Sequence, residues 1–377
     1  MKHSFPFIAL AVFLITHLGI YFFYFKRIIK NPLFLRIARY FLILNYGGSL
    51  MYFFGRHYVN MPPALYFLVT LSIGITFILA VATLVYQPLS FIPLFSKTRR
   101  AFLQKTIGTM SLAFSGSYLG WGLIEGAMQP QIEKVKILIP NLPQTIRAAQ
   151  ISDLHIGTLM EETKVAKIVQ QTNALKSDII FLTGDIIDAN IIKTQKSLEE
   201  LSKLSAPLGV YFVIGNHEFF HGIGDLLGTL KKLGIQVLEN ENVVIQKEGV
   251  ELFNLAGVYD LYGRRVGLEP NLNQALSQRK EELPTILLAH QPKFALEVQE
   301  EHKVDLILSG HTHGGQIFPF RFLIPLNQPY IQGLYQHNPQ TQIYVNRGTG
   351  FWGPQMRVLT RAEITYFELV PLTDKNE

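Results

Sequence analysis

The sequence predicts an α/β domain that follows a helical, membrane-spanning N-terminal third. Three observations predict this arrangement: apolar stretches of membrane-spanning length before residue 131, short Val/Ile/Leu-rich runs from residue 147 onward, and amphipathic segments between those runs. Apolar strands that alternate with amphipathic helices are typical of an α/β domain. We therefore expect a transmembrane region over 1–130, a linker over 131–146 and a folded α/β domain over 147–377. Within the linker, residues 138–144 are either connection or the first edge strand.

Four apolar stretches occupy the N-terminal region, over residues 5–25, 40–54, 64–86 and 106–127. A membrane-spanning helix needs about 20 mostly apolar residues, and the first and third stretches meet this requirement easily. The second follows Arg36 and Arg39 and is shorter, so residues 33–54 either span the membrane or form an interfacial helix. The pattern predicts a bundle of about four transmembrane helices.

The net positive charge of the chain comes from this region. Eleven Lys and Arg residues and a single acid, Glu125, precede residue 131, although the whole chain has a net charge of only +6. Because these basic residues lie between apolar segments and not on a domain face, we exclude nucleic acid as a partner. The basic loops 26–39 and 97–105 are expected in the cytoplasm, whereas the middle loop holds only Arg56. This predicts a multi-pass protein of the cell membrane with everything after Ala127 on the extracytoplasmic side.

A second feature, at residues 98–105, also indicates export. The run Thr-Arg-Arg-Ala-Phe-Leu-Gln-Lys precedes a moderately apolar stretch and resembles a twin-arginine signal, which would make the twin-arginine export machinery a partner. The alternative is an ordinary basic flank with two adjacent arginines. Since no small-residue cleavage site is obvious before Gln129, we expect the segment to remain as an anchor.

In the second half of the chain, five polar motifs follow one another, mostly where an apolar run gives way to Gly or a polar turn. They are Asp153-Leu154-His155, Gly184-Asp185-Ile186-Ile187-Asp188, Gly215-Asn216-His217-Glu218, Ala289-His290 and Gly310-His311-Thr312-His313. Carboxylate, imidazole and amide groups at strand ends are the components of a two-metal site. The chain has no cysteine, so a metal must bind nitrogen and oxygen ligands, which suit Mn, Fe, Zn, Mg or Co.

At these motifs the chain resembles the calcineurin-like metallophosphoesterases, over roughly residues 147–369, and most closely their bacterial membrane-associated branch. The match rests on Ser152 to Gly157, on Gly310 to Gln316 and on Asn346-Arg347-Gly348 followed by Pro354, Arg357 and Glu363. The resemblance implies a four-layer α/β/β/α sandwich. It also implies an enzyme that hydrolyses phosphoric ester bonds.

The resemblance further implies a binuclear centre with two divalent metal ions. One ion would be held by Asp153, His155, Asp185 and His313, and the other by Asp185, Asn216, His290 and His311. Sharing of the carboxylate would bring the ions about 3.5–4 Å apart, so that a bridging water loses its proton near neutral pH and attacks phosphorus. Asp185 is in this sense also catalytic.

Other polar residues of the motifs are expected to act beside the ions. His217 would stabilise developing charge or protonate the leaving oxygen without binding metal. Asp188 and Glu218 are interpreted as supporting or turn-stabilising residues, and His221 either as a neighbour of this turn or as a surface residue. No substrate-binding residue is predicted.

The phosphoprotein phosphatases of this superfamily carry two arginines that grip the phosphate, where this chain has Ala189 and Ile214. We therefore predict a membrane-anchored enzyme for phosphodiester or pyrophosphate bonds. The alternatives are an extracytoplasmic phosphomonoesterase or nucleotidase, and a non-catalytic binding protein on the same fold. The proline-broken apolar stretch 314–326 either forms an exposed patch that suits a lipid-linked substrate or packs against the membrane segments or the core.

Overall fold

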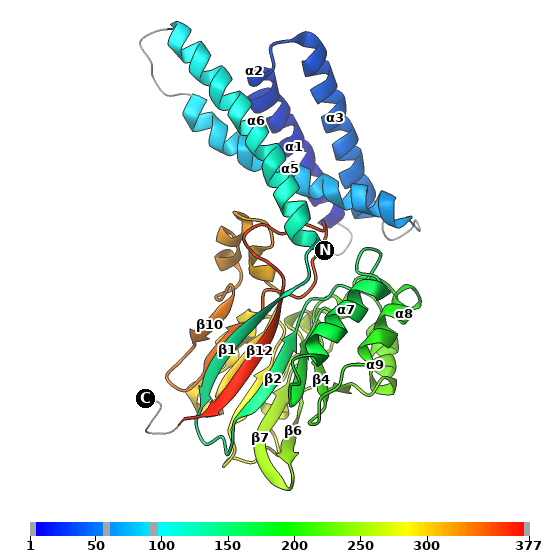
Figure 1. Ribbon diagram of the computed structural model, residues 1–377, viewed down its shortest axis with the longest axis vertical. Coiled ribbons are helices and arrows are strands. Elements are labelled where there is room, and N and C mark those ends of the chain that lie inside the picture. Colours follow the sequence, from blue (N-terminus) through cyan, green and yellow to red (C-terminus); the bar gives the residue numbers. More distant parts are fainter. Residues whose placement is uncertain (1–4, 56–60, 91–96, 373–377) are drawn as a thin grey trace. The chain divides into compact units, whose positions relative to one another are not determined.

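The computed structural model describes residues 5–55, 61–90 and 97–372 and is drawn in Figure 1. The chain forms two compact units. A helical unit comprises the residues up to Ala127 together with 353–358, and an α/β unit comprises 128–352 together with the residues from Leu359 onward. The chain therefore leaves the α/β unit directly after Trp352 and returns to it at Leu359.

The helical unit consists of four long helical segments that pack on one another (Figure 1). Their elements are α1 (Phe5–Ile20) with the π-helical turn η1 (Tyr21–Phe25) and α2 (Lys26–Ile28), α3 (Pro32–Leu50) with η2 (Met51–Gly55), α5 (Pro63–Ser90), and α6 (Lys97–Ala127). Helix α3 begins where it does because the Asn31 side chain accepts the backbone N–H groups of Leu33 and Phe34, and Pro32 fits the first helical turn.

Two of the four predicted membrane spans form helices that are long and apolar enough to cross a membrane. Among the described residues, 7–28 and 63–88 meet the length and hydropathy expected of a spanning helix, whereas α3 and α6 do not. Both exceptions are helical, but Arg36 and Arg39 interrupt the apolar surface of α3, and Gly and Ser dilute that of α6. Arg56, on which the predicted topology partly rests, lies outside the described residues. The prediction of four spanning helices is therefore supported for two of them.

A buried polar cluster joins α1, α3 and α5. Asn45 donates through its side-chain amide to the hydroxyl of Thr76 at 2.7 Å and to the carbonyl of Ser72 at 3.2 Å. The same amide nitrogen lies 3.1 Å from Nε2 of His17. Hydrogen bonds of this kind hold helices together where apolar surfaces alone give little specificity.

The α/β unit contains two six-stranded mixed sheets. The first sheet has the strand order β1-β12-β2-β3-β4-β5 and the second the order β10-β11-β9-β8-β7-β6. The strands are β1 (Gln131–Ile139), β2 (Ile146–Ile151), β3 (Ile179–Thr183), β4 (Val210–Val213), β5 (Gln236–Val237), β6 (Glu241–Lys247), β7 (Val250–Gly257), β8 (Thr285–Leu288), β9 (Leu306–Ser309), β10 (Gly333–Gln336), β11 (Gln342–Val345) and β12 (Glu363–Pro371). Strands β2 to β5 run parallel, as do β7, β8, β9 and β11.

The sheets face each other across an apolar core, to which Phe181 and Phe367 of the first sheet and Phe253 and Leu288 of the second contribute fully buried side chains. Helices α7 (Glu162–Asn173), α8 (Ile191–Leu201) and α9 (Ile223–Lys232) cover the outer face of the first sheet (Figure 1). The second sheet is covered by the four-residue helix α10 (Leu272–Ala275) and the 3-10 turn η5 (Pro292–Glu297). The expected mixed α/β architecture is present, with a thin fourth layer.

Part of the predicted linker is a strand. Residues 131–139 form β1, which pairs in parallel with β12 over nine residue pairs at the edge of the first sheet. Its sequence alternates, with Lys134 and Lys136 exposed and Ile137 and Ile139 buried between the sheets. That period-2 pattern identifies a half-buried strand, and its physical reason is that an edge strand needs only one apolar face. Only the turn before Ile146 remains as a connection.

We expect Ile137→Ala to destabilise the α/β unit by about 2–5 kcal/mol, because it leaves a cavity between the sheets. The matched change Lys136→Ala on the exposed face should alter the free energy of unfolding by less than about 0.5 kcal/mol. Urea unfolding of the full chain in detergent, followed by near-ultraviolet circular dichroism, measures both. Equal, small effects would mean that 131–139 is a linker after all.

Candidate metal centre

The residues singled out as metal ligands lie just beyond the carboxyl ends of parallel strands. Asp153 follows β2 and Asp185 follows β3, each two residues after the strand ends, and Asn216 lies three residues after β4. In the second sheet, His290 follows β8 and His311 follows β9 in the same way. Since parallel strands end at the same edge, both sheets direct these side chains into one region.

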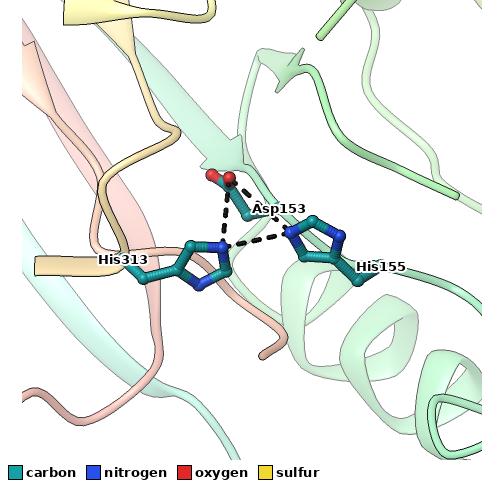
Figure 2. A group of neighbouring side chains, drawn as sticks. All are labelled: Asp153, His155 and His313. Carbon is teal, nitrogen blue, oxygen red and sulfur yellow. Dashed lines mark hydrogen bonds and ion pairs between the residues drawn. The ribbon is translucent and has the colours of Figure 1, made fainter. Parts of the chain in front are cut away.

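Asp153, His155 and His313 form one group of neighbouring side chains (Figure 2). The Nε2 atoms of His155 and His313 lie 3.1 Å apart, and Nε2 of His313 lies 3.5 Å from Oδ1 of Asp153. Two imidazole nitrogens at this distance can both present lone pairs only if a cation or a proton lies between them. A cation bound by both nitrogens and by the carboxylate fits this arrangement.

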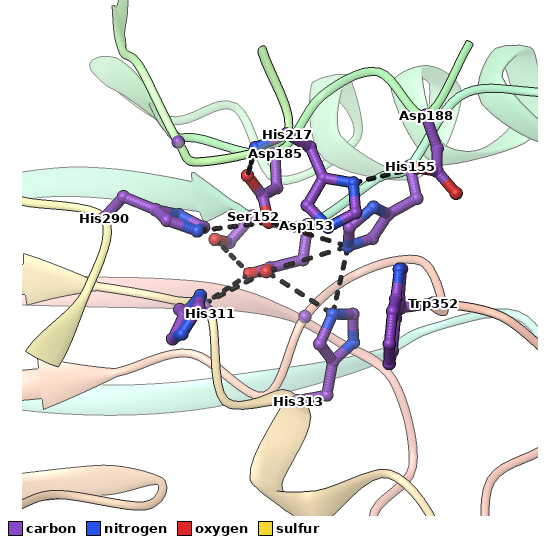
Figure 3. Close-up of polar contacts among 12 residues, drawn as sticks. Ser152, Asp153, His155, Asp185, Asp188, His217, His290, His311, His313 and Trp352 are labelled. Carbon is purple, nitrogen blue, oxygen red and sulfur yellow. Dashed lines mark hydrogen bonds and ion pairs between the residues drawn. The ribbon is translucent and has the colours of Figure 1, made fainter. Parts of the chain in front are cut away.

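Asp185, His290 and His311 form a second group (Figure 3). Nδ1 of His290 lies 2.7 Å from the carbonyl oxygen of Thr183, which can only accept, so Nδ1 carries a hydrogen and Nε2 offers a lone pair when the ring is neutral. That Nε2 atom is buried, makes no hydrogen bond and lies 3.2 Å from Oδ2 of Asp185. Oδ1 of Asn216 is also buried without a hydrogen-bond partner. Buried polar atoms rarely lack partners, so these two atoms fit a metal ion.

A single carboxylate oxygen faces both groups. Oδ1 of Asp185 accepts the backbone N–H of His217 at 2.8 Å, which fixes the orientation of the carboxylate. Oδ2 then lies 3.2 Å from Nε2 of His290 and 3.9 Å from Nε2 of His155. The geometry is that of a carboxylate shared between two adjacent sites.

The chain matches the family model for calcineurin-like phosphoesterases over residues 146–315. It is 38% identical over 358 residues to a metallophosphoesterase of Helicobacter pylori strain J99, covering 92% of this chain and 94% of that protein. A Campylobacter jejuni metallophosphoesterase is 31% identical, with 97% and 98% covered. A zebrafish protein described as a transmembrane protein with metallophosphoesterase domain is 33% identical, with 87% and 78% covered.

The chain belongs to the calcineurin-like phosphoesterase family. This confirms the resemblance drawn from the motifs and identifies the chain as a hydrolase of phosphoester bonds. Members of the family bind divalent metals, and the His and Asp groups of this phosphoesterase are able to hold them. The name of the zebrafish relative, together with the two apolar helices, supports association with a membrane.

Five of the seven proposed ligands of the phosphoesterase have backbone conformations in the left-handed region. They are Asp153, His155, Asp185, His311 and His313, with φ between 50° and 71°. Such conformations are strained for residues other than Gly and collect at functional sites. The surrounding turns leave no room for residues larger than glycine at two positions. A Cβ on Gly215 would lie 2.3 Å from Oδ1 of Asp185, and one on Gly310 would lie 1.9 Å from Oγ of Ser152.

Glu218 holds two of these turns together. Its buried carboxylate accepts the backbone N–H groups of Gly215, Asp185, Ile186 and Ile187 at 2.7–3.3 Å. It therefore joins the turn after β3 to the turn after β4. The prediction that Glu218 stabilises a turn is confirmed.

His217 lies beside both groups with its two ring nitrogens in different roles. Nδ1 donates to Oδ1 of Asp188 at 2.8 Å, and Nε2 lies 4.0 Å from Oδ2 of Asp185. Nε2 of His221 lies 3.4 Å from the same oxygen of Asp188, so His221 is a neighbour of this turn. Burial disfavours the charged imidazolium of His217, but Asp185 and Asp188 outweigh burial and raise its pKa to about 9.

The imidazoles of His155 and His311 have the opposite electrostatic environment. Burial, together with the neighbouring histidines, lowers the pKa of each to about 3. Both rings are therefore neutral near pH 7, as metal ligands must be. Burial also raises the pKa of Asp153 to about 6, since its charge is costly in this interior without a nearby cation.

Sequence reasoning missed three residues around this site. The hydroxyl of Ser152 donates to Oδ2 of Asp153 at 2.5 Å and orients that carboxylate. Trp352 lies with its ring centroid 6.2 Å from that of His217, and Gln316 binds its backbone. The adjacent pair Ser152-Asp153 was visible in the sequence, whereas only the folded chain brings Trp352 close to His217 (Figure 3).

Glu218→Ala should lower the free energy of unfolding by about 3 kcal/mol or more, because several buried N–H groups lose their only acceptor. Glu218→Gln keeps one acceptor oxygen and should cost less. The exposed Glu301→Ala serves as the control and should change stability by less than about 0.5 kcal/mol. Thermal unfolding in detergent ranks the three variants, and a Glu218→Ala protein as stable as the control would contradict this role.

Proposed function

We propose that the chain is a membrane-anchored phosphoesterase that uses two divalent metal ions to hydrolyse phosphodiester or pyrophosphate bonds. The observation that carries this proposal is the orientation of Oδ2 of Asp185 toward the imidazoles of both groups. Asp153, His155, Asp185 and His313 would hold one ion, and Asp185, Asn216, His290 and His311 the other. The set fits Mn, Fe, Zn, Mg or Co, all of which accept nitrogen and oxygen ligands.

The bound ions would supply an activated water and would neutralise charge on the phosphoryl oxygens. His217 acts on the leaving group. Its Nδ1 is held by Asp188, so Nε2 is free to give its proton to the oxygen of the leaving group as the phosphorus–oxygen bond breaks. The raised pKa of His217 keeps this proton in place at neutral pH.

The class of substrate is inferred from two further features. Ala189 and Ile214 offer no guanidinium for a dianionic monoester, which favours a less charged diester or pyrophosphate over a phosphomonoester or nucleotide. In addition, the stretch that follows His313 forms the 3-10 turns η8 (Phe320–Phe322) and η9 (Ile324–Leu326), which expose Phe320, Phe322 and Leu326 to solvent. An exposed apolar patch in an anchored enzyme supports a lipid-linked substrate.

Treatment with a chelator should abolish hydrolysis of an aryl phosphodiester, and Mn²⁺, Zn²⁺ or Mg²⁺ should restore it. Asp185→Asn and His311→Ala should each lower both activity and metal content, as measured by elemental analysis. His217→Ala should keep its metal and lose activity by about 10²–10⁴-fold. Full activity of a metal-free Asp185→Asn protein would sink the mechanism.

Replacing Phe318, Phe320 and Phe322 with Ser should depress hydrolysis of a lipid phosphodiester in detergent much more than that of a small aryl diester. The physical reason is that the Ser variants lack apolar surface that only the lipid substrate would cover. Each Å² of apolar surface removed from water contributes about 25 cal/mol to binding. Equal losses on both substrates would indicate misfolding and count against a lipid substrate. A faster reaction with aryl monoesters than with diesters would favour a phosphomonoesterase.

We further propose that the α/β unit lies outside the cytoplasm. A reporter that works only outside the cytoplasm, fused after Glu377, should be active. Changing Arg99 and Arg100 to Lys should reduce its export if the twin-arginine machinery carries the chain. A reporter that is active only in the cytoplasm would overturn the topology, whereas normal export of the Lys pair would remove the twin-arginine signal alone.

A further inference from the structure

Two exposed aromatic side chains flank His217. The ring centroid of Trp352 lies 6.2 Å from that of His217 and the ring centroid of Phe220 lies 5.3 Å away, both edge to face. Trp352 is 46% exposed and Phe220 is 49% exposed, whereas the imidazole between them is buried. Large aromatic rings left open to water beside a buried reactive group provide a surface for part of a substrate.

Trp352 is held in this place by Gln316. The side chain of Gln316 donates to the carbonyl oxygen of Trp352 at 2.8 Å and accepts its backbone N–H at 2.9 Å. Thr360 in turn donates through its hydroxyl to the carbonyl oxygen of Gln316 at 2.6 Å. Gln316 is three residues beyond His313, so the turn that carries a proposed metal ligand also fixes the backbone of the tryptophan.

Phe220 is fixed from the other side. It ends the 3-10 turn η3 (Glu218–Phe220), which begins directly after His217. Its ring packs edge to face against Tyr262 with a centroid distance of 4.8 Å, and the guanidinium of Arg265 lies over the Tyr262 ring at 5.4 Å. Both rings beside His217 are thus positioned in advance, so that little side-chain entropy is lost when a substrate binds.

We propose that Trp352 and Phe220 are substrate-positioning residues that bind the leaving group, and that this group is an alcohol with an alkyl chain. The inference rests on the function proposed above, because that function places the reaction beside His217, where both rings lie. In that reaction the oxygen of a water molecule bonds to phosphorus, the phosphorus–oxygen bond to the alcohol breaks, and one proton of the water ends on the alcohol oxygen. The alkyl chain of the leaving alcohol would lie against the two rings.

The surroundings favour an alkyl chain over a planar base. The turn η7 (His313–Gly315) packs against η8 (Phe320–Phe322), and the exposed Leu323 and Leu326 follow. These exposed side chains, which follow the turn of His313, offer further apolar surface that a flexible chain can cover along its length. A nucleobase would need polar groups aimed at its edges as well as a ring to stack on.

The test uses phosphodiesters that share one phosphoryl part and differ only in the leaving alcohol: methyl, octyl or dodecyl. These alcohols are about equally basic, so differences in kcat/KM report binding of the chain. For the full-length protein in detergent we expect kcat/KM to rise with length by up to about fourfold for each methylene that leaves water. Trp352→Ala and Phe220→Ala should flatten this dependence, so that the ratio of kcat/KM for the dodecyl ester to kcat/KM for the methyl ester falls in both variants.

Three controls make the outcome specific. Val250→Ser removes an equally exposed apolar side chain at the first residue of β7. It should leave the dependence of kcat/KM on the length of the alkyl chain intact. Trp352→Phe should restore part of it. Gln316→Leu should flatten it as well, because the backbone of Trp352 is then no longer held.

Fluorescence gives a reading that is independent of turnover. The chain has only two tryptophans, so Trp121→Phe leaves Trp352 as the single indole. A non-hydrolysable dodecyl phosphonate should shift its emission to the blue, and a methyl phosphonate should not. Equal kcat/KM for all three alcohols, or a dependence on length that survives Trp352→Ala, would overturn the proposal while the phosphoesterase function stands. Stronger dependence on Trp352 for a nucleoside leaving group than for dodecanol would overturn the alkyl assignment.

Discussion

The position of the Asp185 carboxylate is the constraint on which this site depends. One of its oxygens is occupied by the backbone N–H of His217, and the other faces the imidazoles of both sheets. Because the carboxylate is buried, its charge must be offset by nearby positive charge. In the proposed function, two cations that shared this oxygen would satisfy that requirement.

The fold provides this position by bringing the carboxyl ends of strands from both sheets together. Parallel strands β2, β3 and β4 end beside β8 and β9, and tight turns follow each of them. The turns are strained, since the backbone of Asp185 and of four other proposed ligands is left-handed. Glu218 offsets part of that strain by accepting four backbone N–H groups. The stability of the turns and the geometry of the site therefore depend on the same side chain.

The mixed α/β class of the second unit could be predicted from the sequence, and most of the candidate ligands named from the sequence lie together in the structure, because both depend on local signals. Apolar runs that end in Gly, Asp or His mark strand ends, and Glu218 could be assigned to a turn from its place after Asn216-His217. An edge strand was left open only for residues 138–144, which Pro140 and Pro143 interrupt, although the alternation of Lys134 to Ile139 belongs to a strand that begins at Gln131. Contacts between distant residues, such as those of Trp352 with Gln316 and His217, leave no local signal.

The measurement that tests a shared carboxylate most directly is electron paramagnetic resonance of the Mn²⁺-loaded protein. Two Mn²⁺ ions about 3.5–4 Å apart and bridged by Asp185 should give an exchange-coupled spectrum at two ions per chain. Asp185→Asn should convert it to the spectrum of isolated Mn²⁺ or remove it. Uncoupled Mn²⁺ in the unaltered protein at full loading, or coupling that survives Asp185→Asn, would contradict the shared centre.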